Sequence, residues 1–317
     1  MPAHPPPNPD SGAPESRAVR RHFARAALTY DGSAVLQREI GGRLAERLDP
    51  MKLVPGAVLD VGCGTGDAQA ELAARYPSAR YVGLDIALPM LEAARAKARL
   101  SRSAVARIFA ALGGARSATE PRFVCGDVAA LPFAAATFDL VWSNLALQWV
   151  ADPPAAFAEM NRVLTVDGLA LFTTFGPDTL KEVRAAFAGV DRHVHVSRFV
   201  DMHDIGDMLV AAGFADPVMQ MDMMTLTYDD ASAMLRDLKA IGATNAAHAR
   251  PRALMGRQRW QRALAALDAS RRDGRLTATF EVIYGHAWKV APRRTRAGDA
   301  IVQFRPPASK PGNDVRN

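Results

Sequence analysis

Glycines and acidic residues recur in the first half of the chain at spacings that suit nucleoside binding. The segment Asp60–Asp67 has glycines at positions 62, 64 and 66 and follows directly on an apolar run, Ala57–Val61. Glycines at alternate positions let backbone N–H groups approach a ligand closely, where a side chain would collide with it. A helical pattern begins near Asp67, so the segment predicts a strand, a tight turn and a helix N-terminus, the arrangement by which α/β folds bind nucleotides.

Two more acidic residues follow at the ends of the next expected strands. Residues 79–85 predict a second strand that ends in Asp85, where a carboxylate can accept hydrogen bonds from both ribose hydroxyls. We expect Ile86 and Met90 to flank an adenine ring. A third expected strand, residues 122–125, leads into Gly126-Asp127-Val128.

The elements that must position these residues follow a βαβα order. Five strand signals before residue 176 predict an α/β fold with a doubly wound, mostly parallel sheet. Two helices within residues 20–48, interrupted at Asp31-Gly32-Ser33, precede the first strand. The other expected strands are 140–144, 169–175 (after a turn at Asp167-Gly168), 219–228 and 277–289, and the other expected helices are 67–76, 88–100, 155–164, 179–187, 202–212 and 230–241.

We expect one domain between two tails. Residues 1–19 are rich in proline and predict a disordered tail, residues 20–290 form the domain, and residues 291–317 form a flexible tail. Within the domain we assign residues 20–50 to a helical cap, 51–176 to the cofactor core, and 177–290 to the acceptor side and the completion of the sheet. Residues 101–120 predict a surface insertion or a helix extension.

Composition limits the class of protein. With 317 residues, of which 49% are apolar, the chain can bury a large core. It has no uninterrupted apolar run of about 18 residues, so we expect no transmembrane helix. The first residues lack the apolar segment of a secretory signal. Cys63 and Cys125 lack metal-site spacing, and a reducing cytoplasm is the simplest compartment for this chain.

Positive charge is concentrated late in the chain. The net charge is +6, and eight arginines lie between residues 250 and 275 against two aspartates. Such a segment can meet nucleic acid or an acidic protein, or can be a solvated helix face. Aromatic residues do not alternate with the arginines as they do on nucleic-acid platforms, which disfavours that alternative.

The G-x-G-x-G turn after Asp60, with Asp85 and Gly126-Asp127-Val128 in this order, resembles the class I S-adenosylmethionine-dependent methyltransferases. A phosphate would gain little from a carboxylate at Asp60, whereas the ammonium group of S-adenosylmethionine would. The resemblance places Asp127 near the adenine amino group. It implies the cofactor-binding residues Tyr30, Gln37, Asp60, Gly62, Cys63, Gly64, Gly66, Asp85, Ile86, Met90, Gly126, Asp127, Val128, Asn144 and Leu145.

Ser143–Trp149 resembles a narrower family, the malonyl-acyl carrier protein O-methyltransferases of biotin synthesis, and so do Leu238–Thr244 and Phe280–Gly285. That family implies methylation of the free carboxylate of malonyl-acyl carrier protein or malonyl-coenzyme A, giving the ester that primes pimeloyl synthesis. The Phe175–Leu180 pattern also resembles a mitochondrial complex I assembly factor, an arginine hydroxylase. That function, and methylation of a small metabolite such as a quinone precursor, remain alternatives.

The implied reaction needs few catalytic groups. A malonyl carboxylate is already ionised at pH 7, so no general base is required and we assign no catalytic residue. The candidates for positioning the acceptor are Tyr30, Gln148, Trp149 and Arg198, the last as a carboxylate clamp. His193 and His195 lack a third ligand, so we expect no metal. An acidic carrier protein would dock on five of the late arginines, Arg250, Arg252, Arg257, Arg259 and Arg262.

Overall fold

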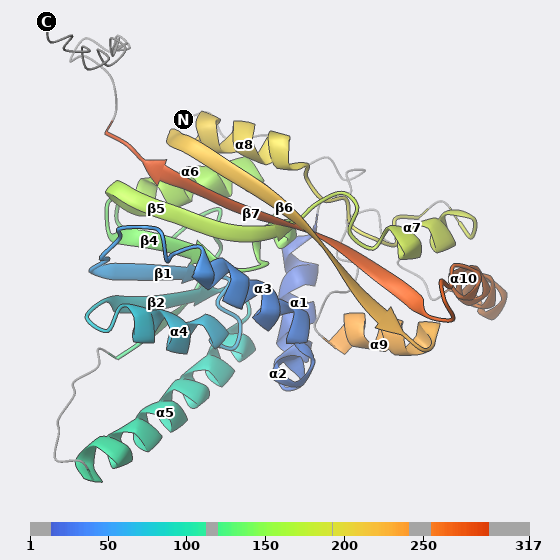
Figure 1. Cartoon of the computed structure of the whole chain (residues 1–317), viewed down its shortest axis with the longest axis horizontal. Coiled ribbons are helices and arrows are strands. Elements are labelled where there is room, and N and C mark those ends of the chain that lie inside the picture. Colours follow the sequence, from blue (N-terminus) through green and yellow to red (C-terminus); the bar gives the residue numbers. More distant parts are fainter. Residues whose placement is uncertain (1–13, 112–119, 192, 241–254, 292–317) are drawn as a thin grey trace, which may run out of the picture.

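The computed structural model describes residues 14–111, 120–191, 193–240 and 255–291. Its centre is one seven-stranded sheet with the order β3-β2-β1-β4-β5-β7-β6 (Figure 1). The strands are β1 (Ala57–Val61), β2 (Arg80–Asp85), β3 (Arg122–Cys125), β4 (Phe138–Ser143), β5 (Leu164–Phe175), β6 (Phe214–Tyr228) and β7 (Leu276–Lys289). β1 to β5 pair in parallel, and β7 lies antiparallel between β5 and β6.

Helices cover both faces of this sheet, as a doubly wound fold requires. They are α1 (Ser16–Ala26), α2 (Tyr30–Ser33), α3 (Val35–Glu46), α4 (Asp67–Arg75), α5 (Leu88–Ala111), α6 (Pro153–Val163), α7 (Lys181–Ala188), α8 (Met202–Ala211), α9 (Ala231–Ala240) and α10 (Arg257–Ala269). Within the described residues, every helix is too short or too polar to span a membrane.

Two large apolar clusters, one on each face, form the core. One joins α3, α4, α7, α9 and α10 to the sheet, and the other joins α6 and α8 to it. All five residues of β1 are buried, as the continuous apolar run predicts for a central parallel strand. Because β1 and β4 are adjacent and parallel, their carboxyl ends meet at one edge of the sheet. Figure 1 shows α1, α2 and α3 at this edge.

The fold class and the order of the strands are confirmed, but α10 was not expected and several boundaries are different. β5 begins at Leu164, immediately after α6, so the expected turn at Asp167-Gly168 lies inside the strand. The pairing of β4 with β5 shifts register between Phe138 and Leu140, and Asp167 has a φ of 64°, so the chain accommodates the irregularity as a bulge. β6 likewise begins at Phe214, earlier than expected.

The ends of the helices also differ from the expectation. α1 begins at Ser16, so residues 16–19 are helical and the assignment of a tail to 1–19 was wrong there. Asp31-Gly32-Ser33 interrupts nothing, because it belongs to the short helix α2. α5 continues to Ala111, which makes the first half of residues 101–120 a helix extension. The tail segments 1–13 and 292–317, and most of Leu238–Thr244, lie outside the described residues.

Candidate cofactor site

A cleft at the carboxyl edge of the sheet brings most of the expected cofactor residues together. It encloses about 870 Å³ including the part open to solvent, within the range of small-molecule sites. Of the residues expected to bind the cofactor, the following line it: Tyr30, Gly62, Gly64, Asp85, Ile86, Met90, Gly126, Asp127, Val128, Asn144 and Leu145. They come from α2 and from the segments that follow β1, β2, β3 and β4.

The glycine turn is held in a conformation that favours glycine. Gly62 and Gly64 have φ values of 71° and 52°, in the left-handed region. The Gly62 N–H donates to the Leu84 carbonyl at 2.7 Å, which fixes the turn against the end of β2. A Cβ on Gly62 would lie 2.2 Å from the Cβ of Ala146, so the turn and the segment after β4 touch at this point.

Asp85 connects the turn to the second strand. Its Oδ2 accepts from the Gly64 N–H at 3.0 Å, and its Oδ1 accepts from the Ala87 N–H at 2.8 Å. Burial raises the pKa of Asp85 to about 6, although these backbone hydrogen bonds lower it. The carboxylate is therefore oriented by the backbone and largely ionised at neutral pH. It can still accept hydrogen bonds from hydroxyl groups of a ligand.

The amino-terminal helices cover the cleft. Val19 and Phe23 on α1 and Tyr30 on α2 line it from one side, and Trp149 lines it from the other. The Phe23 ring makes edge contacts with both Trp149, at 5.5 Å between centroids, and Tyr30, at 6.4 Å. Burial raises the pKa of the Tyr30 phenol, and the nearby carboxylates of Asp67 and Asp85 raise it further. The phenol therefore remains a hydrogen-bond donor at neutral pH.

A polar cluster fastens α2 to the core beside the cleft. Asp31 accepts a hydrogen bond from the Thr65 hydroxyl in the glycine turn. Its other carboxylate oxygen lies 3.1 Å from Lys97 Nζ on α5, and Lys97 also pairs with Asp67 at the start of α4. The cap is thus joined to the glycine turn and to α5.

Asn144 joins the end of β4 to the cap and to β5. Its Nδ2 donates to the Gln37 carbonyl on α3 at 2.9 Å, and its Oδ1 accepts from the Thr173 hydroxyl at 2.7 Å. The Gln148 side chain donates to the Leu145 carbonyl at 2.7 Å. These contacts hold the segment after β4 in place, so Asn144 lines the cleft with its side chain already satisfied.

Four expected cofactor residues lie outside the lining of the cleft. Asp60 is buried and accepts from the Tyr81 hydroxyl at 2.5 Å. Val58 is paired with Tyr81, so Asp60, two residues further along β1, lies on the same face of the sheet as Tyr81. Its carboxylate is therefore bonded to β2 and is absent from the described lining of the cleft. Cys63, Gly66 and the Gln37 side chain are also absent from the described lining.

Two of the four acceptor candidates are in the cleft, and two are not. Tyr30 and Trp149 line it, whereas Gln148 and Arg198 are absent from the described lining. Arg198 is exposed and has no hydrogen bond or ion pair with another described residue. Its neighbour Phe199 packs on Phe175 at the carboxyl end of β5, with 5.8 Å between ring centroids. Arg198 is therefore near the edge of the sheet that bears the cleft.

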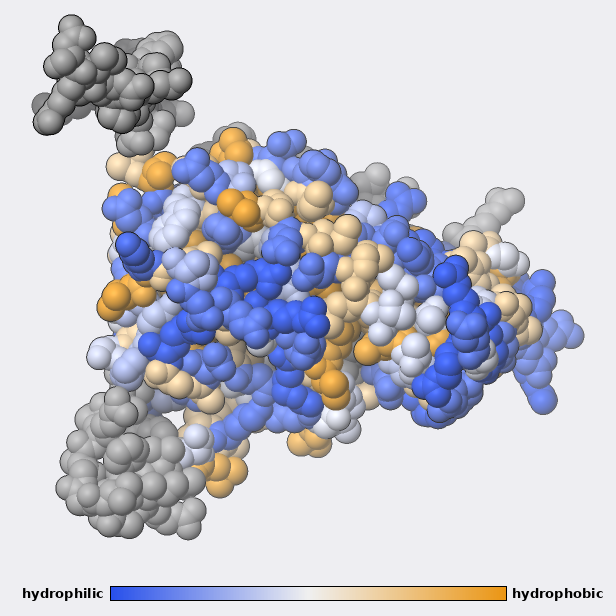
Figure 2. Space-filling view, viewed as in Figure 1, coloured by the Kyte–Doolittle hydropathy of each residue, from blue (hydrophilic) through white to orange (hydrophobic). Residues whose placement is uncertain are grey.

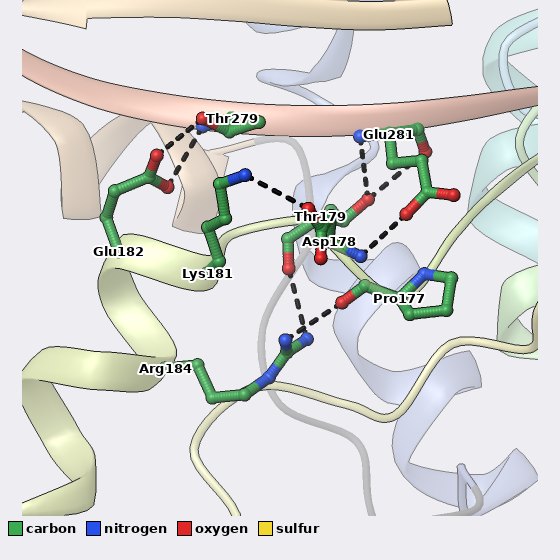
Figure 3. Close-up of polar contacts among 8 residues, drawn as sticks. All are labelled: Pro177, Asp178, Thr179, Lys181, Glu182, Arg184, Thr279 and Glu281. Atoms are coloured by element: carbon green, nitrogen blue, oxygen red, sulfur yellow. Dashed lines mark hydrogen bonds and ion pairs between the residues drawn. The ribbon is translucent and has the colours of Figure 1, made fainter. Parts of the chain in front are cut away.

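The loop that follows β5 is fastened to β7 by buried polar contacts (Figure 3). Glu281 on β7 accepts from the Asp178 N–H at 2.7 Å, and its own N–H donates to the Thr179 hydroxyl at 3.1 Å. Arg184 on α7 donates to the carbonyls of Pro177 and Thr179, at 2.8 and 3.1 Å. All of these contacts satisfy protein groups, so the segment is a structural support at the same edge of the sheet.

The histidine pair has local partners. His195 lies 2.8 Å from Asp191 and stacks on Phe187, with 4.5 Å between ring centroids. The backbone N–H of His193 donates to the same aspartate at 2.9 Å. Within the described part of the chain, no group of three or more His, Cys, Asp or Glu side chains could hold a metal ion.

Sequence reasoning missed the residues that α1 and the segment after Trp149 contribute. Ser16 and Val19 fall in the predicted tail, and no role at the cofactor site is predicted for Val150 and Asp152, yet all four line the cleft. The helical spacing of Phe23 and the following apolar residues indicated an amphipathic helix. It could not indicate which surface that helix covers.

The cleft suits a nucleoside that carries a positive charge. Asp85 is fixed for contact with hydroxyl groups, and Ile86, Met90 and Val128 supply apolar surface beside it. The Asp127 carboxylate accepts from the Ala129 N–H at 3.0 Å and also faces the cleft. The described lining contains carboxylates but no Lys, Arg or His side chain, so its charge favours a cationic ligand over an anionic pyrophosphate.

Comparisons with known proteins agree with this geometry. Residues 59–172 match a family model described as a methyltransferase domain. The chain is 52% identical over 289 residues to a malonyl-acyl carrier protein O-methyltransferase of Gallionella capsiferriformans, covering 91% of this chain and 96% of that protein. It is 53% identical over 293 residues to the protein of the same name from Laribacter hongkongensis, covering 92% and 96%.

Solved structures share the fold. The YcgJ protein from Bacillus subtilis superposes with a TM-score of 0.56 at 18% sequence identity, covering 80% of this chain and 99% of that one. At this identity the similarity applies to the fold alone.

Proposed function

This chain belongs to the malonyl-acyl carrier protein O-methyltransferase family, and we propose on that basis that it methylates the free carboxylate of a malonyl thioester, with S-adenosylmethionine as methyl donor. The observation that carries the proposal is the extent of the similarity. It covers 91% of the chain, whereas the methyltransferase domain ends at residue 172. The carboxyl-terminal third, which we assign to the acceptor side, is therefore included. The relatives give the arginine hydroxylase alternative no support.

The residues of the cleft divide into two roles in this proposal. Asp85 would hold the ribose hydroxyls and Asp127 the adenine amino group, with Met90 and Ile86 against the ring. S-adenosylmethionine, when bound, supplies an electrophilic methyl group on a sulfonium. Asp60, which is bonded to Tyr81 and absent from the described lining, would fix the carboxyl end of β1 against β2 and would not contact the ammonium directly.

The chain's task in the reaction is alignment and the exclusion of water. A malonyl carboxylate is ionised at neutral pH, so the reaction needs neither a general base nor a metal to activate the acceptor. Desolvation raises the reactivity of such a carboxylate, and positioning converts the encounter into an intramolecular step. The cap formed by Phe23, Tyr30 and Trp149 would exclude water, and the Tyr30 phenol can donate a hydrogen bond to the acceptor.

Arg198 is the proposed clamp for the malonyl carboxylate or the thioester carbonyl. It is an exposed cation without a described partner, next to Phe199 at the carboxyl end of β5. We expect Arg198→Met to raise KM for the malonyl substrate about tenfold, and Arg198→Lys to restore part of the loss. An unchanged KM for Arg198→Met would exclude this role.

The carrier protein is the proposed macromolecular partner, with α10 among its docking surfaces. Arg257, Arg259 and Arg262 are exposed, and Figure 2 shows a strongly hydrophilic surface over α10. Arg250 and Arg252 lie outside the described residues. Complementary charge accelerates association and makes it sensitive to salt. If neutralising Arg257, Arg259 and Arg262 left the rate on the carrier substrate and its salt dependence unchanged, docking on α10 would be wrong.

A substrate comparison tests the central proposal. Purified protein should transfer a methyl group to malonyl thioesters and not to acetyl thioesters, because only the former carry a free carboxylate. In cells, the gene should restore growth of a biotin-requiring methyltransferase mutant on biotin-free medium. A folded, expressed protein that does neither would overturn the proposal.

A further inference from the structure

The outer face of α1 carries a group of exposed arginines that have no role in the proposed function as stated so far. Arg17, Arg20, Arg21 and Arg25 are all exposed. Their spacing of three and four residues places them on one face of the helix. None of the four forms an ion pair or hydrogen bond with another described residue, and the first turn of α1 contains no acidic residue. We call these four arginines the cap basic face.

The opposite face of the same helix lines the cofactor cleft. Ser16, Val19 and Phe23 project into it. α1 is held by two small apolar clusters, one with Ala87 and Met90 and one with Trp149, both separate from the two large core clusters. Segments with few buried apolar contacts open at a low free-energy cost. A partner that binds the cap basic face and also inserts its acyl arm into the cleft would therefore favour the closed position of α1, because it can make both contacts at once only when α1 borders the cleft.

We propose that the cap basic face docks an acidic surface of the carrier protein and that this docking holds α1 closed over the cofactor cleft. The proposal rests on the proposed function, because it takes the carrier-bound malonyl thioester as substrate. Acyl carrier proteins are strongly acidic, so their charge complements four unpaired arginines. The substrate arm must also enter next to a helix that borders the cleft, and α1 satisfies this condition directly.

Other anionic partners fit this surface less well. A helix that lies on a membrane inserts its apolar face into the lipid. In α1 that face, which includes Val19, Phe23 and Ala26, is packed against the protein. A protein that binds single-stranded nucleic acid places aromatic side chains beside its cations. The cap basic face consists of arginines alone.

The cap basic face and α10 make separate contributions. α1 packs on α5 and borders the cleft, whereas α10 packs on α7 and α9. Charges on α10 can accelerate the encounter from a distance. Charges on α1 can couple the bound partner to closure of the cleft, because α1 has one face in the cleft and one in solvent, whereas α10 contributes no residue to the described lining.

Neutralising the cap basic face tests the docking. The variant Arg17→Gln/Arg21→Gln/Arg25→Gln should raise KM for malonyl-carrier protein by about tenfold or more, with a weaker dependence on salt. Its kcat/KM for malonyl-pantetheine, which has no protein part, should equal that of the wild type. The matched control, Lys52→Gln/Arg99→Gln/Arg122→Gln, removes the same charge from exposed positions elsewhere. It should leave both acceptors unaffected.

Hydrogen exchange tests the coupling to the cap. Adding carrier protein to the wild type with S-adenosylhomocysteine should slow exchange of the amides of α1, and the triple variant should lose this effect. A triple variant with the same KM for the carrier as its control would overturn the proposal. So would binding of the wild type, and not the variant, to phosphatidylglycerol vesicles with unchanged carrier kinetics. If the wild type methylates neither acceptor, the proposed function itself fails, which is a different result.

Discussion

Replacing Gly62 with alanine tests how tightly the glycine turn is packed. Gly62 has a φ of 71°, where a Cβ costs roughly 1–2 kcal/mol. The new Cβ would also lie 2.2 Å from the Cβ of Ala146, far inside ordinary contact distance. Relieving such an overlap costs about 1–3 kcal/mol. We therefore expect Gly62→Ala to lower the free energy of unfolding by about 2–5 kcal/mol, the sum of the two costs.

Gly64 provides the matched control. It lines the same cleft with a φ of 52°, but its added Cβ would meet only Tyr30, at 3.9 Å. Gly64→Ala should therefore lower the free energy of unfolding only by the cost of a Cβ in the left-handed conformation, about 1–2 kcal/mol. The double variant Gly62→Ala/Ala146→Gly removes the second Cβ of the overlapping pair. When Ala146→Gly is the reference, the free-energy cost of adding Gly62→Ala should fall to about that of Gly64→Ala.

Urea unfolding of the wild type and these variants measures the free energies, and calorimetry with S-adenosylhomocysteine measures the effect on the cleft. The midpoint for Gly62→Ala should be well below that for Gly64→Ala, and its affinity for the nucleoside should fall as the turn shifts. Equal stabilities of the two single variants, or no recovery in the double variant, would refute the predicted contact between the turn and Ala146.

Three further perturbations follow from the same structure. Burial raises the pKa of Asp60 from 3.8 to about 7, so the stability that its proton provides is complete below about pH 4 and is lost as pH rises through 7. About 3 kcal/mol of this loss falls between pH 5 and pH 8, and Asp60→Asn should remove it when unfolding is measured at these two pH values. A variant as pH-sensitive as the wild type would contradict this. Thr179→Val leaves the Glu281 N–H and carbonyl without the Thr179 hydroxyl and should cost about 1–3 kcal/mol in urea unfolding, whereas Thr179→Ser should cost less. Phe23→Ala should weaken nucleoside binding about tenfold by calorimetry, because Phe23 joins Tyr30 and Trp149 over the cleft, whereas Phe23→Leu should weaken it less; equal affinities would exclude α1 as a cover.

Short-range patterns predicted the cofactor core well. The run Ala57–Val61 and the glycines that follow it specify a buried strand and a turn from local properties alone, namely apolar continuity and freedom at positive φ. Asp85 and Asp127 were predicted in the cleft because the ends of parallel strands in a doubly wound sheet meet at one edge. In each case the relevant information lies within a few residues of the chain.

The errors came from contacts between distant segments. Asp60 follows the same strand pattern as the cleft residues, yet its side chain faces Tyr81 because the register of β1 with β2 places them on one face. The start of β5 depended on the bulge against β4, which no local turn signal reveals. For residues 101–120 the helix extension, one of the two expected alternatives, is found as far as Ala111.

The sequence by itself determined the fold class, the cofactor turn and the likeness to the family, because glycine spacing, strand ends and motif order are properties of neighbouring residues. The tertiary structure alone decided that α1 covers the cleft with one face and presents four arginines to solvent with the other. It also decided that the Asp60 side chain pairs with Tyr81 on β2. Which side of a helix or strand faces a ligand depends on the elements packed against it, and those elements are far away in the chain.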